Sequence, residues 1–141
     1  MKQRPFSIQT FYPYGDTEGY RICQIPTRTI QAIYIPRKEI NKAIQDRNEL
    51  KYNALYFLFQ TFKGESNNEK QYGYIGESES IAERLKNHDK NKNEWEVAIV
   101  FTTTGAENQL TKADIKYLEN YCYQKALEAE RYFINQNNPT K

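Results

Sequence analysis

The fold of this chain is decided by the sequence Ala-Leu-Tyr-Phe-Leu-Phe at residues 54–59 and by Tyr-Ile-Gly at residues 74–76. A polar segment rich in Gly, Asn and Ser, residues 63–71, separates the two. An apolar run, a polar segment and a second aromatic run are typical of a β-hairpin. The first run is apolar on both of its faces, so we expect it to form a central strand that is covered on both sides.

Two tyrosines, Tyr56 and Tyr74, stand within these strands. If the strands pair side by side, both side chains can lie on the same face of the sheet. Gly73 and Gly76 flank the second tyrosine, and a glycine within a strand allows a backbone or a ligand to approach closely. Taken one at a time, tyrosines in such strands are more often core or sheet-face aromatic residues than catalytic ones.

The composition indicates one domain, or one domain with an extension, in 141 residues. Apolar residues make up only 38 %, but aromatic residues make up 14 %, so Tyr and Phe can build the core. No apolar run reaches the length of a membrane span and no signal segment opens the chain, so we expect a soluble, cytoplasmic protein with no membrane partner. The net charge of +2 means that any basic surface for nucleic acid must be local.

The cysteines and the histidine exclude the usual zinc sites. Cys23 and Cys122 lie far apart with no CxxC motif, and His88 is the only histidine. We expect both thiols to be reduced and structural, as in cytosolic proteins.

Residues 1–50 predict a β-rich extension with one helix. The expected strands are residues 6–12, 20–25 and 29–35. Pro36 suits the first turn of a helix, whose apolar stripe is formed by Ile40, Ala43 and Ile44. The sequence does not indicate whether this extension packs against the domain expected at residues 51–141.

Downstream of the hairpin the pattern predicts helix, strand and helix. A capping box that starts at Ser80 begins a helix to about Lys90. Residues 96–102 are apolar on both faces and form a third strand of the main sheet. Thr111 caps a long helix that reaches about Arg131. The fold class is therefore α+β, with a small central antiparallel three-stranded sheet flanked by helices.

One side chain of the last helix breaks its apolar pattern. At about 100° per residue, one stripe is formed by Ile115, Leu118, Cys122, Ala126 and Ala129. Glu119 falls at the edge of that stripe, and a carboxylate that faces a core costs several kcal/mol of solvation unless a cation or hydrogen bonds offset it. Glu119 therefore either has a metal ion or an arginine as a partner, or reaches solvent beside the stripe.

The helix that starts near Ile81 also carries polar residues beside its apolar face. Arg84 and His88 are one turn apart, on or next to the face formed by Ile81 and Leu85. Taken singly, Arg84 is explained as a surface arginine whose stem covers apolar surface. His88 is explained as a hydrogen-bonded packing residue.

Taken together, these residues resemble the pattern of the GIY-YIG endonucleases, a family of metal-dependent nucleases. That pattern has two tyrosine tripeptides, then an arginine, often a histidine or tyrosine one turn later, a glutamate on a later helix and an asparagine beyond it. The chain offers, in this order, Tyr56, Tyr74, Arg84, His88, Glu119, and Asn135 or Asn137. The resemblance covers roughly residues 54–138, and residues 1–50 look like an extension that some bacterial members carry.

The resemblance implies a GIY-YIG nuclease-like fold and a metal-dependent endonuclease that hydrolyses phosphodiester bonds in DNA. It makes Glu119 the protein ligand of one Mg²⁺ or Mn²⁺ ion, whose remaining ligands are water and substrate. It assigns Arg84 to the scissile phosphate, which a planar guanidinium holds well.

The family pattern gives Tyr56 the task of activating the attacking water. A tyrosine with a pKa near 10 is a poor base at neutral pH, so His88 or Tyr74 would accept or share its proton. Asn135 or Asn137 would brace the site by hydrogen bonds.

The chain departs from the pattern in several places. Ala54 and Leu55 replace the Gly and Ile of the first tripeptide, and the loop between the tyrosine strands is longer than usual. Glu77 stands where many members carry a lysine, which removes a cation that could lower a tyrosine pKa or contact phosphate. An alternative is a non-catalytic nucleic-acid-binding or partner-binding module on the same fold, but the filled polar positions favour the enzyme.

Overall fold

The computed structural model describes residues 5–26, 29–60, 71–90, 95–129 and 132–133. Within these residues the strands are β1 (Gln9–Phe11), β2 (Arg21–Gln24), β3 (Ile30–Pro36), β4 (Ala54–Gln60), β5 (Gln71–Ser78), β6 (Val97–Thr103) and β7 (Tyr132–Phe133). The helices are α1 (Ile40–Asp46), α2 (Ile81–Lys90) and α3 (Lys112–Ala129), with short 3-10 turns η1 (Arg37–Glu39), η2 (Asn48–Lys51) and η3 (Ala106–Asn108). None of these helices is long and apolar enough to span a membrane.

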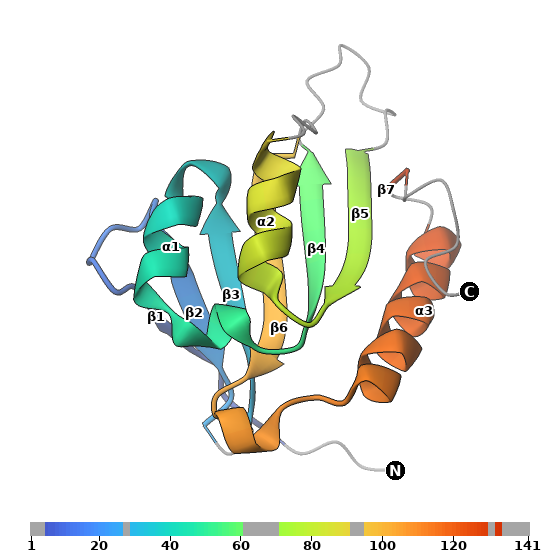
Figure 1. Cartoon of the computed structure of the whole chain (residues 1–141), viewed down its shortest axis with the longest axis horizontal. Coiled ribbons are helices and arrows are strands. Elements are labelled where there is room, and N and C mark those ends of the chain that lie inside the picture. The colour runs from blue at the N-terminus through green and yellow to red at the C-terminus, as the bar shows by residue number, and fades with distance from the viewer. Residues whose placement is uncertain (1–4, 27–28, 61–70, 91–94, 130–131, 134–141) are drawn as a thin grey trace.

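All described strands belong to one sheet in the order β1-β2-β3-β6-β4-β5-β7 (Figure 1). Every neighbouring pair is antiparallel except β5 and β7, which are parallel. The predicted α+β class is confirmed, and the predicted three-stranded sheet, β6-β4-β5, is part of a larger one.

The predicted hairpin is formed by β4 and β5. Tyr56 lies opposite Gly76, and Leu58 lies opposite Tyr74. β4 also pairs with β6 along its other edge, so it is an interior strand, as its apolar faces predict.

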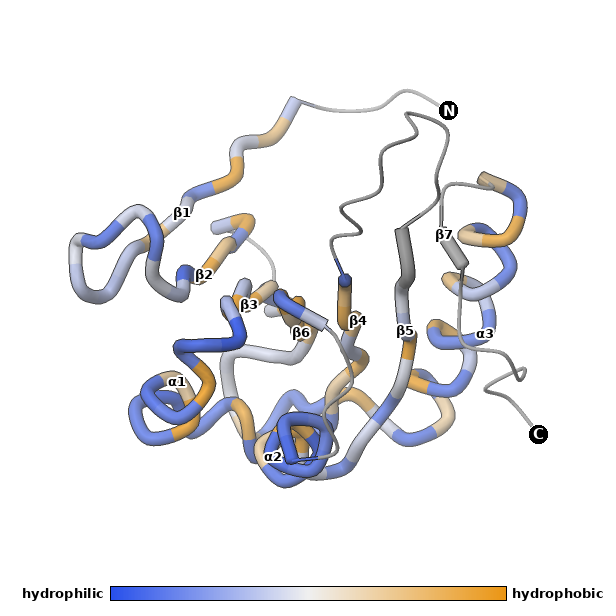
Figure 2. Tube along the Cα trace, turned by 90° about the horizontal axis from the view of Figure 1, so that it is seen from above, coloured by the Kyte–Doolittle hydropathy of each residue, from blue (hydrophilic) through white to orange (hydrophobic). Residues whose placement is uncertain are grey.

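The alternation of side chains along β4 divides the core into two clusters. Tyr56 and Leu58 point to the face that α1 and α2 cover, where they pack with Ile81 and Leu85 of α2. Leu55 points to the opposite face and packs with residues of α3. Figure 2 shows the sheet from above, with α1 and α2 on one side and α3 beside β5.

The N-terminal strands extend the main sheet. β3 pairs with β6 over its whole length, from Ile30 opposite Thr103 to Pro36 opposite Val97. The cluster under α1 and α2 also takes buried side chains from both parts of the chain, among them Ile33 on β3. The division of domains near residue 50 remains a prediction, but one sheet and one of the two core clusters run across it.

The sequence did not predict β7, the strand at the β5 edge of the sheet. β7 has only two residues and pairs with β5, with Gln71 opposite Tyr132. Two residues are too few to show a hydrophobic period, so the sequence offers no signal for this strand.

Candidate active site

Three of the predicted site residues form an aromatic cluster on the face that carries α2. The rings of Tyr56 and Tyr74 stack with their centroids 5.9 Å apart. The ring of His88 lies 5.6 Å from the first tyrosine and 5.1 Å from the second. The Tyr56 hydroxyl and His88 Nε2 are 2.9 Å apart, within hydrogen-bonding distance.

Gly76 makes room for this cluster. A Cβ atom at Gly76 would lie 2.6 Å from both Cζ and Oη of Tyr56, and 2.8 Å from Cε1 of Tyr74. The close approach expected at this glycine is therefore made by the tyrosine rings, which lie across the backbone of β5.

The protonation of the cluster follows from its burial. Tyr56 is buried, and burial together with Tyr74 raises the pKa of its hydroxyl, although the charge of Arg84 opposes this shift. Burial also lowers the pKa of His88, and Arg84 lowers it further. At neutral pH the hydroxyl therefore keeps its proton while the imidazole is neutral and can accept a hydrogen bond at Nε2.

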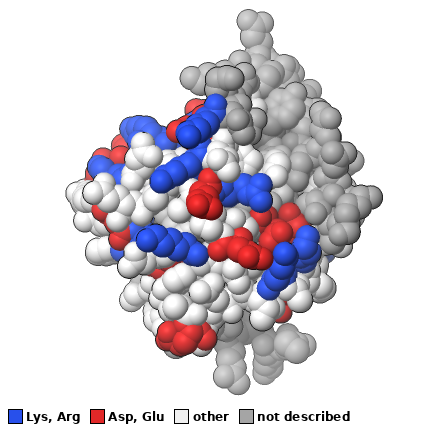
Figure 3. All heavy atoms as spheres, in the orientation of Figure 1, with Lys and Arg blue, Asp and Glu red and all other residues white. Residues whose placement is uncertain are grey.

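Arg84 is exposed on α2, where it lines a polar depression of about 550 Å³. The depression is also lined by Glu77, Ser78, Glu79, Ser80, Glu83, Asn87 and Lys112. It lies where the end of β5 meets the first turns of α2 and α3. Basic and acidic side chains interleave over the face that carries α1 and α2 (Figure 3), so no single sign of charge dominates there.

Glu119 lies on α3, where it is only 4 % exposed. Its Oε1 atom is buried and has no hydrogen-bond partner among the described residues. The pKa of Glu119 is raised to about 7, mainly by burial and then by the charge of Glu77, while Lys116 opposes the shift. The charge of Glu119 also adds to the raised pKa of Tyr56, after burial and Tyr74.

A buried carboxylate oxygen without a donor fits a divalent cation. Hard ions such as Mg²⁺ prefer carboxylate oxygens, and an ion would satisfy the oxygen that the described protein atoms leave unpaired. The described residues contain no group of three or more side chains that could hold a metal. Glu119 would therefore hold the ion with water and substrate as the other ligands.

Glu77, which departs from the family pattern, also acts on this site. In the structure its carboxylate lies 3.8 Å from Lys116 Nζ, and it acts on the pKa of Glu119. Residues three or four apart on a helix are neighbours on one face, and Lys112, Lys116 and Glu119 have this spacing. The sequence could therefore have predicted that the two lysines lie beside the Glu119 carboxylate. Asn135 and Asn137 lie outside the described residues.

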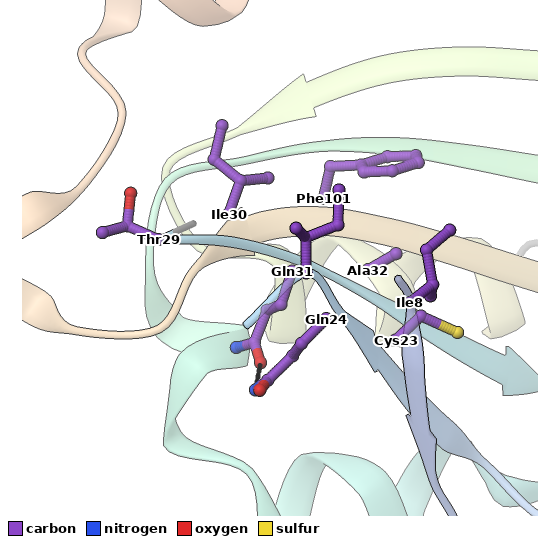
Figure 4. A pocket seen from close by; sticks show the side chains of 9 residues that line it. Ile8, Cys23, Gln24, Thr29, Ile30, Gln31, Ala32 and Phe101 are labelled. Atoms are coloured by element: carbon purple, nitrogen blue, oxygen red, sulfur yellow. Dashed lines mark hydrogen bonds between the residues drawn. The ribbon is translucent and has the colours of Figure 1, made fainter. Parts of the chain in front are cut away.

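An apolar pocket of about 480 Å³ lies elsewhere on the sheet (Figure 4). It is lined by Ile8, Cys23, Gln24, Ile25, Thr29, Ile30, Gln31, Ala32 and Phe101. No charged side chain belongs to this lining, so the depression beside Arg84 is the better candidate for a site that binds phosphate.

Comparison with known proteins gave one finding. Residues 53–141 match the family model of the GIY-YIG catalytic domain. The chain matched no curated protein and no solved structure.

Proposed function

Because this chain belongs to the GIY-YIG catalytic domain family, whose members are nucleases, we propose that it is a metal-dependent endonuclease that hydrolyses phosphodiester bonds in DNA. One observation carries the proposal beyond the family: the Tyr56 hydroxyl lies 2.9 Å from Nε2 of His88, a histidine that is neutral at pH 7. A tyrosine paired with a proton acceptor can take part in proton transfer, whereas an isolated tyrosine is a poor base.

The reaction begins with a water molecule that Tyr56 positions and activates. As the water attacks phosphorus, its proton passes to the Tyr56 oxygen and the tyrosine proton passes to Nε2 of His88. The bond between phosphorus and the leaving oxygen breaks, and the leaving oxygen keeps the bonding electron pair. Tyr74 stacks against Tyr56 and keeps its ring in place.

Arg84 and Glu119 provide the charges that the reaction needs. Arg84 is exposed beside the cluster and donates hydrogen bonds to the scissile phosphate. Glu119 holds Mg²⁺ or Mn²⁺, and the unpaired Oε1 atom supports this role. When bound, the ion supplies positive charge that stabilises the phosphate and the leaving oxygen. Asn135 or Asn137 braces the site, a role that comes from the family pattern alone.

The proposal is tested by incubating the whole chain with plasmid and branched DNA in Mg²⁺ or Mn²⁺, with EDTA as the control. We expect strand breaks that need the metal and that disappear in Glu119→Gln, while the variant still binds DNA. Binding without cleavage by the wild-type protein would instead favour the non-catalytic nucleic-acid-binding module.

A further inference from the structure

The end of α2 is where the N-terminal strands reach the active site. His88 lies in the last turn of α2, which ends at Lys90. The last carbonyl groups of a helix have no partner within that helix, so donors from outside fix how its final turn lies. Whatever binds these carbonyl groups also sets where the His88 ring is held.

Arg37 supplies these donors. It stands in η1, directly after β3. Its Nη2 atom donates to the carbonyl oxygen of Asp89 at 2.9 Å, and its Nε atom donates to the Asp89 carboxylate at 2.8 Å. Its Nη1 atom donates to the carbonyl oxygen of Trp95 at 3.0 Å. A cation at the end of a helix is also favoured by the helix dipole.

Trp95 links Arg37 to His88 by a second route. The indole is only 3 % exposed, and the Arg37 guanidinium lies over it, 4.7 Å from the ring centroid. The indole Nε1 atom donates to the carbonyl oxygen of His88 at 3.5 Å. The backbone N–H of Arg37 also donates to the carbonyl oxygen of Glu96 at 2.8 Å, which fixes η1 to the segment that leads into β6.

We propose that Arg37 is a positioning residue for the reaction: by fixing the last turn of α2, it holds His88 within hydrogen-bonding distance of the Tyr56 hydroxyl. The inference rests on the proposed nuclease function, but the geometry that it concerns can be measured without DNA. Three different nitrogen atoms of the guanidinium donate hydrogen bonds, and a lysine ammonium cannot reproduce that planar arrangement. A displacement of about 1 Å in a catalytic group can cost about 10²-fold in rate.

The test uses the fact that His88 is the only histidine of the chain. Nitrogen-15 NMR of its ring at neutral pH reports which nitrogen carries the proton and whether Nε2 accepts a hydrogen bond. We expect the wild type to give the signature of an Nε2 acceptor, and Tyr56→Phe to lose it. Arg37→Lys and Arg37→Ala should shift toward the spectrum of Tyr56→Phe, although Tyr56 is intact in both.

Activity measurements separate positioning from substrate binding. We expect Arg37→Lys to lower kcat about tenfold and to leave KM for DNA within about twofold, because Arg37 does not touch the substrate in this scheme. Asp89→Asn should have a smaller effect than Arg37→Lys, since the contacts to the two carbonyl groups remain. Arg37→Lys, which keeps the charge, keeps the test open if Arg37→Ala fails to fold.

Arg21 provides a matched control. Arg21 lies on β2, away from α2. Its guanidinium also stacks on an aromatic ring, that of Tyr34, at 4.2 Å from the ring centroid. Arg21→Ala should therefore leave the His88 spectrum and kcat unchanged. A wild-type His88 spectrum in folded Arg37→Lys and Arg37→Ala would overturn the inference whatever the activity. If no variant cleaves DNA but the spectrum shifts, the nuclease proposal fails and the link from Arg37 to His88 stands.

Discussion

At the scale of single residues, the site is built around the space beside Tyr56. The hydroxyl is buried, protonated and hydrogen-bonded to a neutral histidine, so the proton transfer that we propose for it would depend on geometry rather than on a low pKa. A substitution that enlarges a side chain next to Tyr56 should therefore lower the rate of cleavage.

Gly76→Ala tests this dependence. The new methyl group would lie 2.6 Å from the Tyr56 hydroxyl, so the ring or β5 must move. We expect a loss of about 1–3 kcal/mol in unfolding free energy from overpacking, measured by urea denaturation, and a large loss of cleavage. Gly105→Ala is the control, because the nearest atom there is the end of the Glu107 side chain at 3.0 Å. Normal cleavage by Gly76→Ala would mean that the position of the Tyr56 ring does not matter.

The buried carboxyl of Glu119 predicts a pH-dependent stability. Its pKa is raised from 4.5 to about 7 in the folded chain, so the folded state binds more protons than the unfolded state between these values. Without metal, stability should fall as pH rises through this window, by up to ~3 kcal/mol. Glu119→Gln should not show this fall, and it should melt at a higher temperature than the wild type above pH 7. A Glu119→Gln variant that is less stable at every pH would point to a structural ion pair instead.

Glu77 should tune the pH at which metal binds. Its charge helps to raise the pKa of Glu119, and protons compete with the metal for that carboxylate. In Glu77→Gln the pKa of Glu119 should fall, so Mn²⁺ binding followed by electron paramagnetic resonance should persist to lower pH. Glu79→Gln is the matched control, since Glu79 lines the same depression and pairs with Lys112. An unchanged pH profile in Glu77→Gln would show that the two carboxylates are not coupled.

At the scale of helices and strands, the elements with a clear hydrophobic period were predictable. The expected strand at residues 54–59 is β4, and the helix expected from Ser80 to Lys90 is α2. The expected cap of α3 is also present, because Thr111 Oγ1 accepts from the Asp114 N–H at 3.0 Å. Local patterns specify local structure, and these elements needed no other information.

That cap gives a prediction for α3, the helix that carries Glu119. Removing an N-cap hydroxyl costs about 1 kcal/mol, so Thr111→Ala should lower the urea midpoint accordingly. Lys112→Ala changes the next residue, an exposed one, and should stay within about 0.5 kcal/mol of the wild type. Equal stabilities of the two variants would show that the cap contributes nothing.

The family was predictable from the sequence, but the contacts among the residues assigned to the site were not. The order of Tyr56, Tyr74, Arg84, His88 and Glu119 along the chain indicated a family, and their side chains were assigned from that likeness. Which nitrogen of His88 faces which hydroxyl depends on packing between β4 and α2, which sequence spacing does not encode. For the same reason, the hydrophobic period of the sequence does not predict contacts between distant segments, such as the contact of Arg37 with Asp89.

At the scale of the whole molecule, one sheet joins the N-terminal strands β1, β2 and β3 to the strands that follow residue 51. β6 lies between β3 and β4, so it has no free edge among the described strands. A chain that begins at residue 51 would lose β3 and expose the edge of β6. It would also lose core side chains, among them Ile33 and Ile35, which are fully buried.

Truncation tests whether the N-terminal strands are needed for folding. A chain of residues 51–141 should aggregate or fail to give a dispersed NMR spectrum, because an exposed apolar strand edge pairs with other chains. A chain that starts at residue 9 loses Phe6 and Ile8, which are exposed, and should keep its fold and the His88 signature. Solubility, circular dichroism and cleavage of the two chains can be compared with the whole protein. A folded and active 51–141 chain would show that the extension is dispensable, and it would also contradict the positioning role of Arg37.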